Sequence, residues 1–203
     1  MDFSEIKKRI QNKDVKIIAV TKNRDAKTVD ELPPEITCIG ENKIQEAEDK
    51  FPHLNRNFEK HFIGHLQSNK AKKAIQLFDC IQSIDSLKLA EKINQYAGKS
   101  YPIMLQVNIS KDPAKFGFQP EEVPKIIPEI LKLKNLNLIG LMTIGDTHNQ
   151  KQYFSQFKQL FDKCQDIHPI QYLSMGMSDD FEIAIEEGSN MVRLGRILFS
   201  QHD

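Results

Sequence analysis

Lys22 is the residue whose position in this sequence first suggests covalent chemistry. It follows the β-rich run Lys16 to Thr21 and closes the motif AVTK. A lysine amine held in apolar surroundings is a nucleophile that can attack a carbonyl group and form an imine. The alternative is a solvated lysine that opens the next loop. Composition alone favours that interpretation, because most lysines lie on protein surfaces.

The last part of the sequence contains residue types that bind phosphate. In the segment YLSMGMSDDFEIAIEEG, Ser174, Gly176 and Ser178 lead directly into a predicted helix. The free amides and the positive dipole end of a helix N-terminus can hold an anion. We interpret the following Asp179 and Asp180 as helix-capping carboxylates. The segment favours a ligand with a phosphate group and strengthens the functional interpretation of Lys22.

Arg193 and Gly195 lie two residues apart in the run MVRLG, so strand alternation points both to the same side. From that side Arg193 could face a bound ligand, or it could pair with a carboxylate inside the protein. In both cases the arginine needs partners, because an unpaired buried charge is too costly.

Two further motifs each follow a short β-rich run: GEN at Gly40 to Asn42, and HFIGHLQSNK at His61 to Lys70. By themselves they indicate polar loops at strand ends. His61 and His65 are four residues apart but span a strand end and a loop, and the HExxH glutamate is missing, so we expect no metal site. GxGxxG, Walker A, GxSxG and EF-hand motifs are also missing, which argues against nucleotide, hydrolase and calcium-binding functions.

The elements that must position these residues alternate regularly along the chain. Eight β-rich runs are separated by helical patterns with apolar residues every three or four positions. The runs are Lys16 to Thr21, Thr37 to Gly40, His61 to Gly64, Cys80 to Ile84, Ile103 to Ile109, Leu138 to Thr143, Gln171 to Ser174 and Met191 to Leu194. With right-handed crossovers they close most simply into an α/β fold, a single (β/α)8 TIM barrel, and an open doubly wound sheet is the alternative. A barrel places Lys22 at its C-terminal mouth and phosphate sites after the seventh and eighth strands.

Helix boundaries carry their own signals. Asp85 or Ser86 can cap the helix LKLAEKINQYA, and Gly188 is placed to end FEIAIEEG. Pro120 suits a first helical turn, while Pro128 is expected to kink or tighten its helix.

Length and composition bound the remaining possibilities. The chain has 203 residues, which we interpret as one domain over residues 1–203, and 28 acidic residues balance 28 basic ones. That balance gives no overall field for nucleic acid or an anionic membrane. The charged N-terminal segment has no apolar leader, so we expect a soluble cytoplasmic protein. The three cysteines are expected to be reduced and buried: Cys38, Cys80 and Cys164.

Taken together, the motifs resemble one known family. AVTK, IGEN, HFIGHLQSNK, QVNIS, GLMTI, LSMGMSDDFEIAIEEGS and MVRLGRILF follow one another over nearly the whole chain. In this order they closely resemble the pyridoxal phosphate homeostasis protein family, relatives of the alanine racemase N-terminal domain. The segment LSMGMSDD followed by MVRLG is highly specific, whereas AVTK or GEN alone would be weak.

The resemblance implies a barrel of the alanine racemase N-terminal type that holds one pyridoxal 5'-phosphate (PLP) as an internal aldimine on Lys22. It also implies that Asn42 faces the cofactor, that Arg193 approaches the pyridine nitrogen, and that Ser178 with the amides near Gly195 and Arg196 holds the phosphate. The full set of expected cofactor-binding residues is Lys22, Asn42, Ser174, Met175, Gly176, Ser178, Arg193, Gly195 and Arg196. Arg196 departs from the family, which often has a small or hydroxyl residue there.

The function implied by the resemblance is intracellular PLP homeostasis, in which the protein buffers PLP or delivers it to PLP-dependent apoenzymes without substantial catalysis. We expect a monomer that binds neither nucleic acid nor membranes. One alternative is an amino-acid racemase or a related PLP enzyme, which needs a second acid or base across the ring from Lys22. Another is a Schiff-base lyase of the aldolase kind, which would leave Arg193 without a role.

Overall fold

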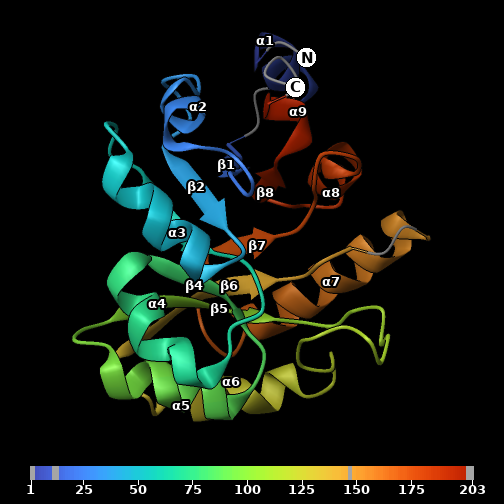
Figure 1. Cartoon of the computed structure of the whole chain (residues 1–203). Coiled ribbons are helices and arrows are strands. Elements are labelled where there is room, and N and C mark those ends of the chain that lie inside the picture. Colours follow the sequence, from blue (N-terminus) through green and yellow to red (C-terminus); the bar gives the residue numbers. More distant parts are fainter. Residues whose placement is uncertain (1–2, 11–13, 146–147, 200–203) are drawn as a thin grey trace.

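The computed structural model describes residues 3–10, 14–145 and 148–199, and in these ranges the chain forms a closed barrel of eight parallel strands (Figure 1). The strands are β1 (Lys16–Val20), β2 (Cys38–Glu41), β3 (Glu59–Phe62), β4 (Cys80–Ile84), β5 (Tyr101–Gln106), β6 (Leu136–Met142), β7 (Tyr172–Ser174) and β8 (Met191–Leu194).

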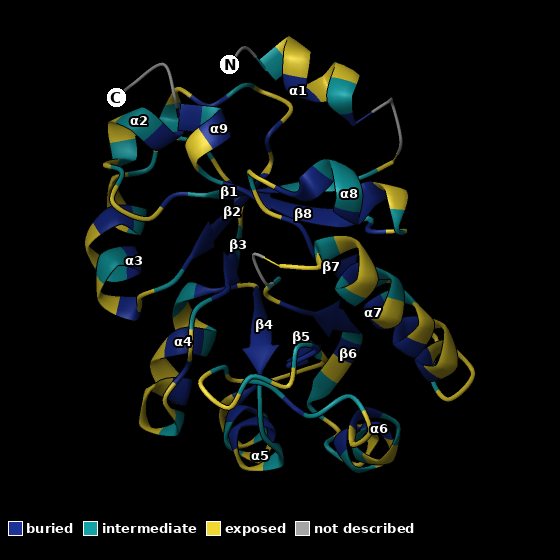
Figure 2. Cartoon of the chain, turned by 90° about the vertical axis from the view of Figure 1, so that its right-hand side faces the viewer, coloured by how far each residue is buried: buried dark blue, intermediate teal, exposed yellow. Residues whose placement is uncertain are grey.

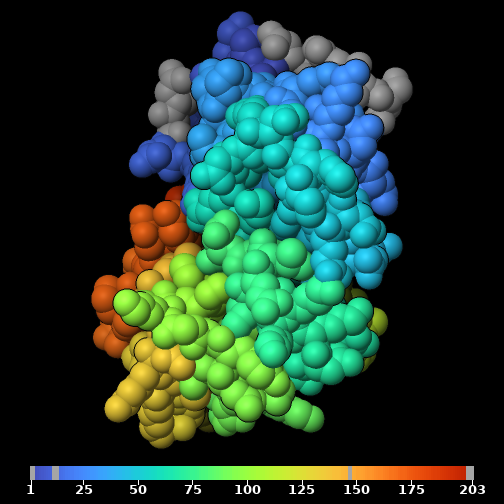
Figure 3. Space-filling view, turned by 60° about the vertical axis from the view of Figure 1, so that its left-hand side comes forward, coloured from blue at the N-terminus to red at the C-terminus, as the bar shows by residue number. Residues whose placement is uncertain are grey.

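Helices connect consecutive strands and surround the barrel, with their exposed sides outward (Figure 2). They are α1 (Phe3–Arg9), α2 (Ala26–Asp30), α3 (Ile44–Lys50), α4 (Ala71–Leu77), α5 (Leu87–Tyr96), α6 (Val123–Leu131), α7 (Gln150–Gln165), α8 (Phe181–Glu186) and α9 (Arg196–Phe199), with short 3-10 turns η1 (Phe51–His53) and η2 (Ser68–Lys70). On the face shown in Figure 3 the bands of colour follow one another in sequence order, as expected when each unit packs on the next. None of the helices in the described ranges has the length and apolar character that a membrane span requires.

Pairing between the first and last strands closes the sheet. Ile18 of β1 aligns with Arg193 of β8, and Ala19 aligns with Leu194. The predicted (β/α)8 barrel is therefore confirmed, and the open doubly wound sheet is ruled out. Closure also brings Arg193, near the end of the sequence, beside the strand that leads to Lys22.

The apolar core has an inner and an outer part. One buried cluster combines residues from six strands, five of which contribute a sulfur-containing side chain: Ile18, Cys38, Cys80, Met104, Met142 and Met191. A larger cluster packs the outer face of the sheet against α3 to α7. The three cysteines are free and buried, as predicted. Strands that are buried on both faces carry few polar side chains. The polar side chains that they do carry need hydrogen-bond partners, and several of them belong to the site described below.

One boundary prediction needs revision, and another is confirmed in one of its two alternatives. Helix α6 begins at Val123, so Pro120 precedes the helix, and Pro124 occupies the first turn instead, where its missing N–H costs nothing. Pro128 does lie inside α6. Of the two candidate caps before α5, Ser86 is the one that acts, because its hydroxyl accepts a hydrogen bond from Leu89 N–H.

Candidate functional site at the barrel mouth

Lys22 lies immediately beyond β1, at the C-terminal mouth of the barrel. Strand pairing continues to Thr21, whose N–H donates to the Gly40 carbonyl over 3.1 Å. Lys22 follows in a turn, which the Arg24 N–H closes by donating to the Thr21 carbonyl oxygen over 3.1 Å. The Lys22 side chain is exposed, and no carboxylate in the described ranges forms an ion pair with it.

A buried ion pair holds the backbone just before Lys22. Glu41 ends β2 and Lys50 ends α3, and their side chains are 0% and 4% exposed. The Lys50 Nζ atom lies 2.5 Å from both Glu41 Oε1 and the Thr21 carbonyl oxygen. The Thr21 hydroxyl donates to the same glutamate oxygen over 2.5 Å. Burial raises the pKa of Glu41, and the bonds from Lys50 and Thr21 oppose that shift.

Glu46, in the first turn of α3, extends this network to the residue after Lys22. Its Oε1 atom lies 3.2 Å from Lys50 Nζ and accepts a hydrogen bond from the Asn23 N–H. Asn23 has a φ angle of 59°, a left-handed conformation that asparagine tolerates better than most residues. The backbone on both sides of Lys22 is therefore bonded to side chains of α3, Lys50 on one side and Glu46 on the other.

Arg193 extends from β8 across the interior and is only 4% exposed. One of its terminal nitrogens donates to Ser174 Oγ and the other to the Thr143 carbonyl oxygen, each over 2.7 Å. Burial lowers the pKa of Arg193 to about 10, and the nearby Asp180 carboxylate partly opposes that shift. A pKa of about 10 still leaves the guanidinium charged at neutral pH.

The loops after β7 and β8 meet at the mouth. The Gly195 N–H donates to the Ser178 hydroxyl over 3.2 Å, which joins the two segments that the sequence suggested for phosphate. Gly176 has a φ angle of +96°, and a Cβ atom there would lie 2.6 Å from the Ala184 Cβ. Only glycine accepts both that conformation and that closeness, so Gly176 lets the loop turn tightly onto α8.

The acidic pair at the start of α8 does not cap that helix as predicted. Asp180 is 5% exposed, and its carboxylate accepts the Met177 N–H over 2.6 Å, a bond within the loop. Asp179 forms a surface ion pair with the Arg196 guanidinium, in which both side chains are more than 70% exposed. The Arg196 side chain is therefore held in an ion pair at the surface. The group of Arg196 that remains available to a ligand is its backbone amide.

Asn42 follows β2 at the same mouth. Its Oδ1 atom is buried and has no hydrogen-bond partner among the described residues. The loop after β3 packs closely against it, since a Cβ atom on Gly64 would lie 2.1 Å from the Asn42 carbonyl oxygen. A buried amide oxygen without a partner is uncommon in native proteins and indicates a position prepared for a ligand or water.

Two of the predicted residues are placed differently from the rest. Ser174 is 0% exposed and bonded to Arg193, so its hydroxyl supports the arginine inside the barrel. Met175 is also 0% exposed, and it packs in the cluster between the sheet and the helices. Sequence reasoning did not identify Thr143 or Lys50 as parts of the site. The motif GLMTI places Thr143 at a strand end, but nothing local marks Lys50 as buried.

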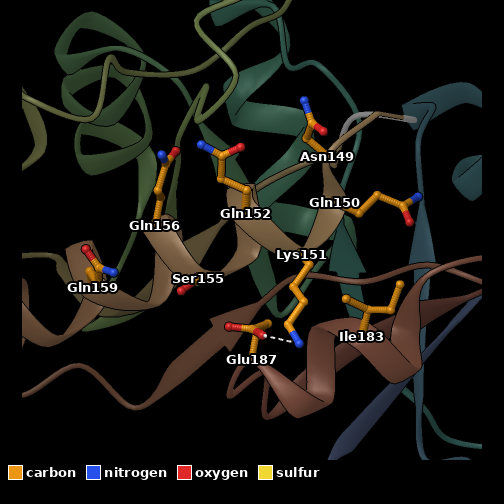
Figure 4. A pocket seen from close by; sticks show the side chains of 9 residues that line it. All are labelled: Asn149, Gln150, Lys151, Gln152, Ser155, Gln156, Gln159, Ile183 and Glu187. Carbon is orange, nitrogen blue, oxygen red and sulfur yellow. Dashed lines mark ion pairs between the residues drawn. The ribbon is translucent and has the colours of Figure 1, made fainter.

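A separate groove lies outside the barrel between α7 and α8, with a volume of about 780 Å³ (Figure 4). Amide side chains dominate its lining, and its lysine, Lys151, lies 3.9 Å from Glu187 Oε1. None of the predicted cofactor-binding residues lines this groove. The chemistry described above is thus confined to the mouth.

Comparison with known proteins agrees with this geometry. The family model for the alanine racemase N-terminal domain matches residues 2–203. The pyridoxal phosphate homeostasis protein of Pasteurella multocida is 37% identical over 203 residues, covering 93% of this chain and 87% of its own length. The Escherichia coli protein of the same name is 35% identical over 205 residues, covering 94% and 87%. The chain belongs to the pyridoxal phosphate homeostasis protein family.

A solved structure of this family has the same fold. PipY of Synechococcus elongatus, determined with PLP bound, superposes with a TM-score of 0.85 at 31% identity and covers 97% of both chains. An alanine racemase of Clostridium difficile has a TM-score of 0.78 at 21% identity, and the match covers 55% of that enzyme. The likeness to the racemase shows a shared barrel alone.

Proposed function

We propose that this protein binds PLP as a Schiff base on Lys22 and serves PLP homeostasis by holding the cofactor and delivering it. Membership of the family and the PLP-bound PipY structure support the binding of PLP. The observation that carries the proposal is the contact between Gly195 N–H and Ser178 Oγ at the mouth, where Lys22 forms no ion pair with any described residue. The Lys22 amine and the two loops suited to phosphate, which follow β7 and β8, then belong to one site.

The residues present fit PLP. Asn42 offers a buried amide oxygen that no described residue satisfies, and Ser178 offers a hydroxyl beside the Gly195 amide. We assign the phosphate to Ser178 and to the backbone amides of Gly195 and Arg196, and the ring side to Asn42. When bound, PLP supplies an aldehyde for the lysine amine and a ring that can act as an electron sink.

The position of Arg193 supports a protein that holds PLP and does not use it for catalytic turnover. Its guanidinium donates to Ser174 and Thr143, is charged, and would approach the pyridine nitrogen from β8. A cation there disfavours protonation of that nitrogen and so weakens the ring as an electron sink. Tyr101 and Tyr172 begin their strands at the opposite end of the barrel, away from Lys22, which argues against either of them as a second base.

Binding is tested with matched lysine variants. Lys22→Ala is expected to abolish the visible absorbance that PLP acquires on forming a Schiff base, and to release all PLP on dialysis. Lys27→Ala, which removes an exposed lysine of α2, should retain both properties. Equal PLP retention by the two variants would contradict the assignment of Lys22.

Delivery is tested with an acceptor. Loaded protein is mixed with a PLP-dependent apoenzyme, and the recovery of acceptor activity is followed with and without a trap for free PLP. Recovery that survives the trap supports direct transfer. Incubation with D- and L-alanine tests the racemase alternative, and rapid loss of enantiomeric excess would overturn the proposal that the protein does not turn over substrate.

We further propose that the protein acts in the cytoplasm as a monomer. Light scattering after size-exclusion chromatography tests the second point, and a mass of twice 23.4 kDa would contradict it.

A further inference from the structure

A continuous line of side-chain hydrogen bonds crosses the barrel interior from Arg193 to the opposite end of the barrel. Arg193 donates to Ser174 Oγ over 2.7 Å, and Ser174 Oγ donates to Gln82 Oε1 over 2.8 Å. Gln82 Nε2 lies 2.7 Å from His61 Nδ1, and His61 Nε2 lies 2.7 Å from Glu59 Oε1. We call these five residues the interior relay. They come from β8, β7, β4 and β3.

The interior relay joins the candidate site to solvent at the base of the barrel. Its three middle residues, Ser174, Gln82 and His61, are each 0% exposed. Glu59 is the first residue of β3, so it lies at the end of the barrel opposite the mouth, and its side chain is 42% exposed. There it also forms an ion pair with Lys16, whose Nζ lies 2.5 Å from Glu59 Oε2.

The two ends of the interior relay fix the direction of every bond in it. A guanidinium can only donate, so Ser174 accepts from Arg193 and directs its own proton to Gln82 Oε1. The amide nitrogen of Gln82 must then face His61 Nδ1, which accepts, and the ring proton resides on Nε2. A carboxylate can only accept, so Glu59 receives that proton. With a neutral imidazole ring, this arrangement gives each of the bonds in the interior relay one donor and one acceptor.

Met191 reinforces this direction. Its thioether sulfur accepts the second N–H of Gln82 over 3.3 Å. If the amide group were turned over, its oxygen would face both this sulfur and the acceptor nitrogen of His61, and neither could donate to it. The orientation of Gln82 is therefore set from two sides.

The charges around His61 are compatible with the neutral ring that the interior relay requires. Burial lowers the pKa of His61, although the adjacent Glu59 and the more distant Asp79 favour the charged form. Lys16 favours the neutral form. Burial raises the pKa of the neighbouring Cys38 thiol, which keeps that group neutral as well.

The same end of the barrel contains three possible metal ligands, because donor atoms of Cys38, Glu59 and His61 lie within 4.8 Å of one another. Both oxygens of Glu59 are already bonded, one to Lys16 and one to His61. The other nitrogen of His61 accepts from Gln82. Glu59 and His61 are thus engaged in hydrogen bonds and an ion pair, and we interpret them as the end of the interior relay and not as metal ligands.

We infer that Gln82, His61 and Glu59 are positioning residues, which hold the Ser174 hydroxyl and through it the Arg193 guanidinium in one orientation toward the cofactor ring. The inference rests on the proposed function, because that function places Arg193 at the ring. Hydrogen bonds in series polarise one another, so a charge at Glu59 is felt by the arginine through the interior relay. In this way Glu59 and His61, at the base of the barrel, influence the effect of Arg193 on the bound cofactor.

The first test uses loaded protein and the pH titration of the Schiff-base absorbance. Gln82→Met interrupts the interior relay with little change in volume, and we expect the titration midpoint to shift by about 0.5 pH unit or more. Glu59→Gln should shift it in the same direction and by less, and should add nothing in the Gln82→Met background. Glu35→Gln is the matched control, because it removes an exposed glutamate paired with Lys7 that is not part of the interior relay.

Three outcomes would overturn the inference in this test. They are an unchanged midpoint in Gln82→Met, an equal shift in Glu35→Gln and Glu59→Gln, and additive shifts in the double variant, which would show independent effects. Borohydride labelling of Lys22 in the unmutated protein is checked first, because a missing label refutes the proposed function and not the interior relay.

The second test needs no cofactor. In apoprotein labelled with nitrogen-15, we expect the His61 ring to carry its proton on Nε2. Glu59→Gln should raise the population of the Nδ1–H tautomer and move the side-chain resonances of Arg193, while backbone amide resonances away from β3 stay in place. Arg193 resonances that do not respond to Glu59→Gln would overturn the inference whether or not PLP binds.

Discussion

Replacing Lys50 by methionine is expected to lower the free energy of unfolding by about 3–5 kcal/mol at pH 7, because it removes one partner of a buried ion pair. The Lys50 and Glu41 side chains are 4% and 0% exposed. Methionine fills nearly the same volume, so the loss comes from charge and hydrogen bonds. Glu41 would keep only the Thr21 hydroxyl, since its Oε2 atom already has no partner among the described residues.

The loss should depend on pH in a defined direction. Burial already raises the pKa of Glu41 above its ordinary 4.5, and removal of the Lys50 ammonium raises it further. The folded variant then binds a proton more tightly than the unfolded chain, so the stability of the variant falls as pH rises from 4.5 through the raised pKa. Urea unfolding at pH 5.5 and pH 7 measures this, and the deficit should be smaller at pH 5.5.

Two further variants decide whether the ion pair is the cause. Lys73→Met removes a lysine that pairs with Glu48 but is 52% exposed, and it should cost less than about 1 kcal/mol. The double variant Glu41→Gln with Lys50→Met removes the stranded charge and should recover more than half of the loss. A Lys50→Met protein within about 1 kcal/mol of the unmutated one, or a double variant no more stable than the single one, would refute the reasoning.

Three other predictions follow from single features. Gly176→Ala should lower the urea midpoint clearly more than Gly98→Ala, because a Cβ atom meets Ala184 at the first position and nothing within 4 Å at the second; equal midpoints would contradict the tight loop. The bonds from His61 and Lys16 lower the pKa of Glu59 to about 2, so its stabilising contribution is present above pH 4.5 and is lost as pH falls toward 2. Glu59→Gln should therefore flatten the loss of stability between pH 5 and pH 3, and an unchanged slope would count against the assignment. A thiol reagent should react with no cysteine until the protein unfolds, because all three cysteines are buried: Cys38, Cys80 and Cys164; rapid labelling of the native protein would contradict this.

Much of the barrel could be predicted because each unit carries local signals. The run before Lys22 and the run around Arg193 are short, apolar and separated from the next helix by polar residues, and the structure has strands there. Gly176 and Ser178 could be predicted to lie in a loop before a helix, because glycine and hydroxyl residues are typical of such positions.

Roles that depend on contacts between distant segments could not be predicted in this way. Ser174 has the residue type of a phosphate ligand, but its position in β7 points it inward to Arg193, 19 residues away. Lys50 looks like a surface lysine at the end of an amphipathic helix, and only the approach of Thr21 and Glu41 shows that it is buried. The ion pair between Arg196 and Asp179 likewise joins two separate loops, and no local sequence signal indicates it.

The central claim concerns the amine at the mouth of the barrel, and mass spectrometry after borohydride reduction tests it most directly. Purified protein is incubated with PLP, reduced and digested, and its peptides are searched for a phosphopyridoxyl group. We predict that the group lies on Lys22 in the peptide after AVT, and that the visible absorbance disappears on reduction. A colourless protein, or a label on another lysine with Lys22 unmodified, would contradict the account.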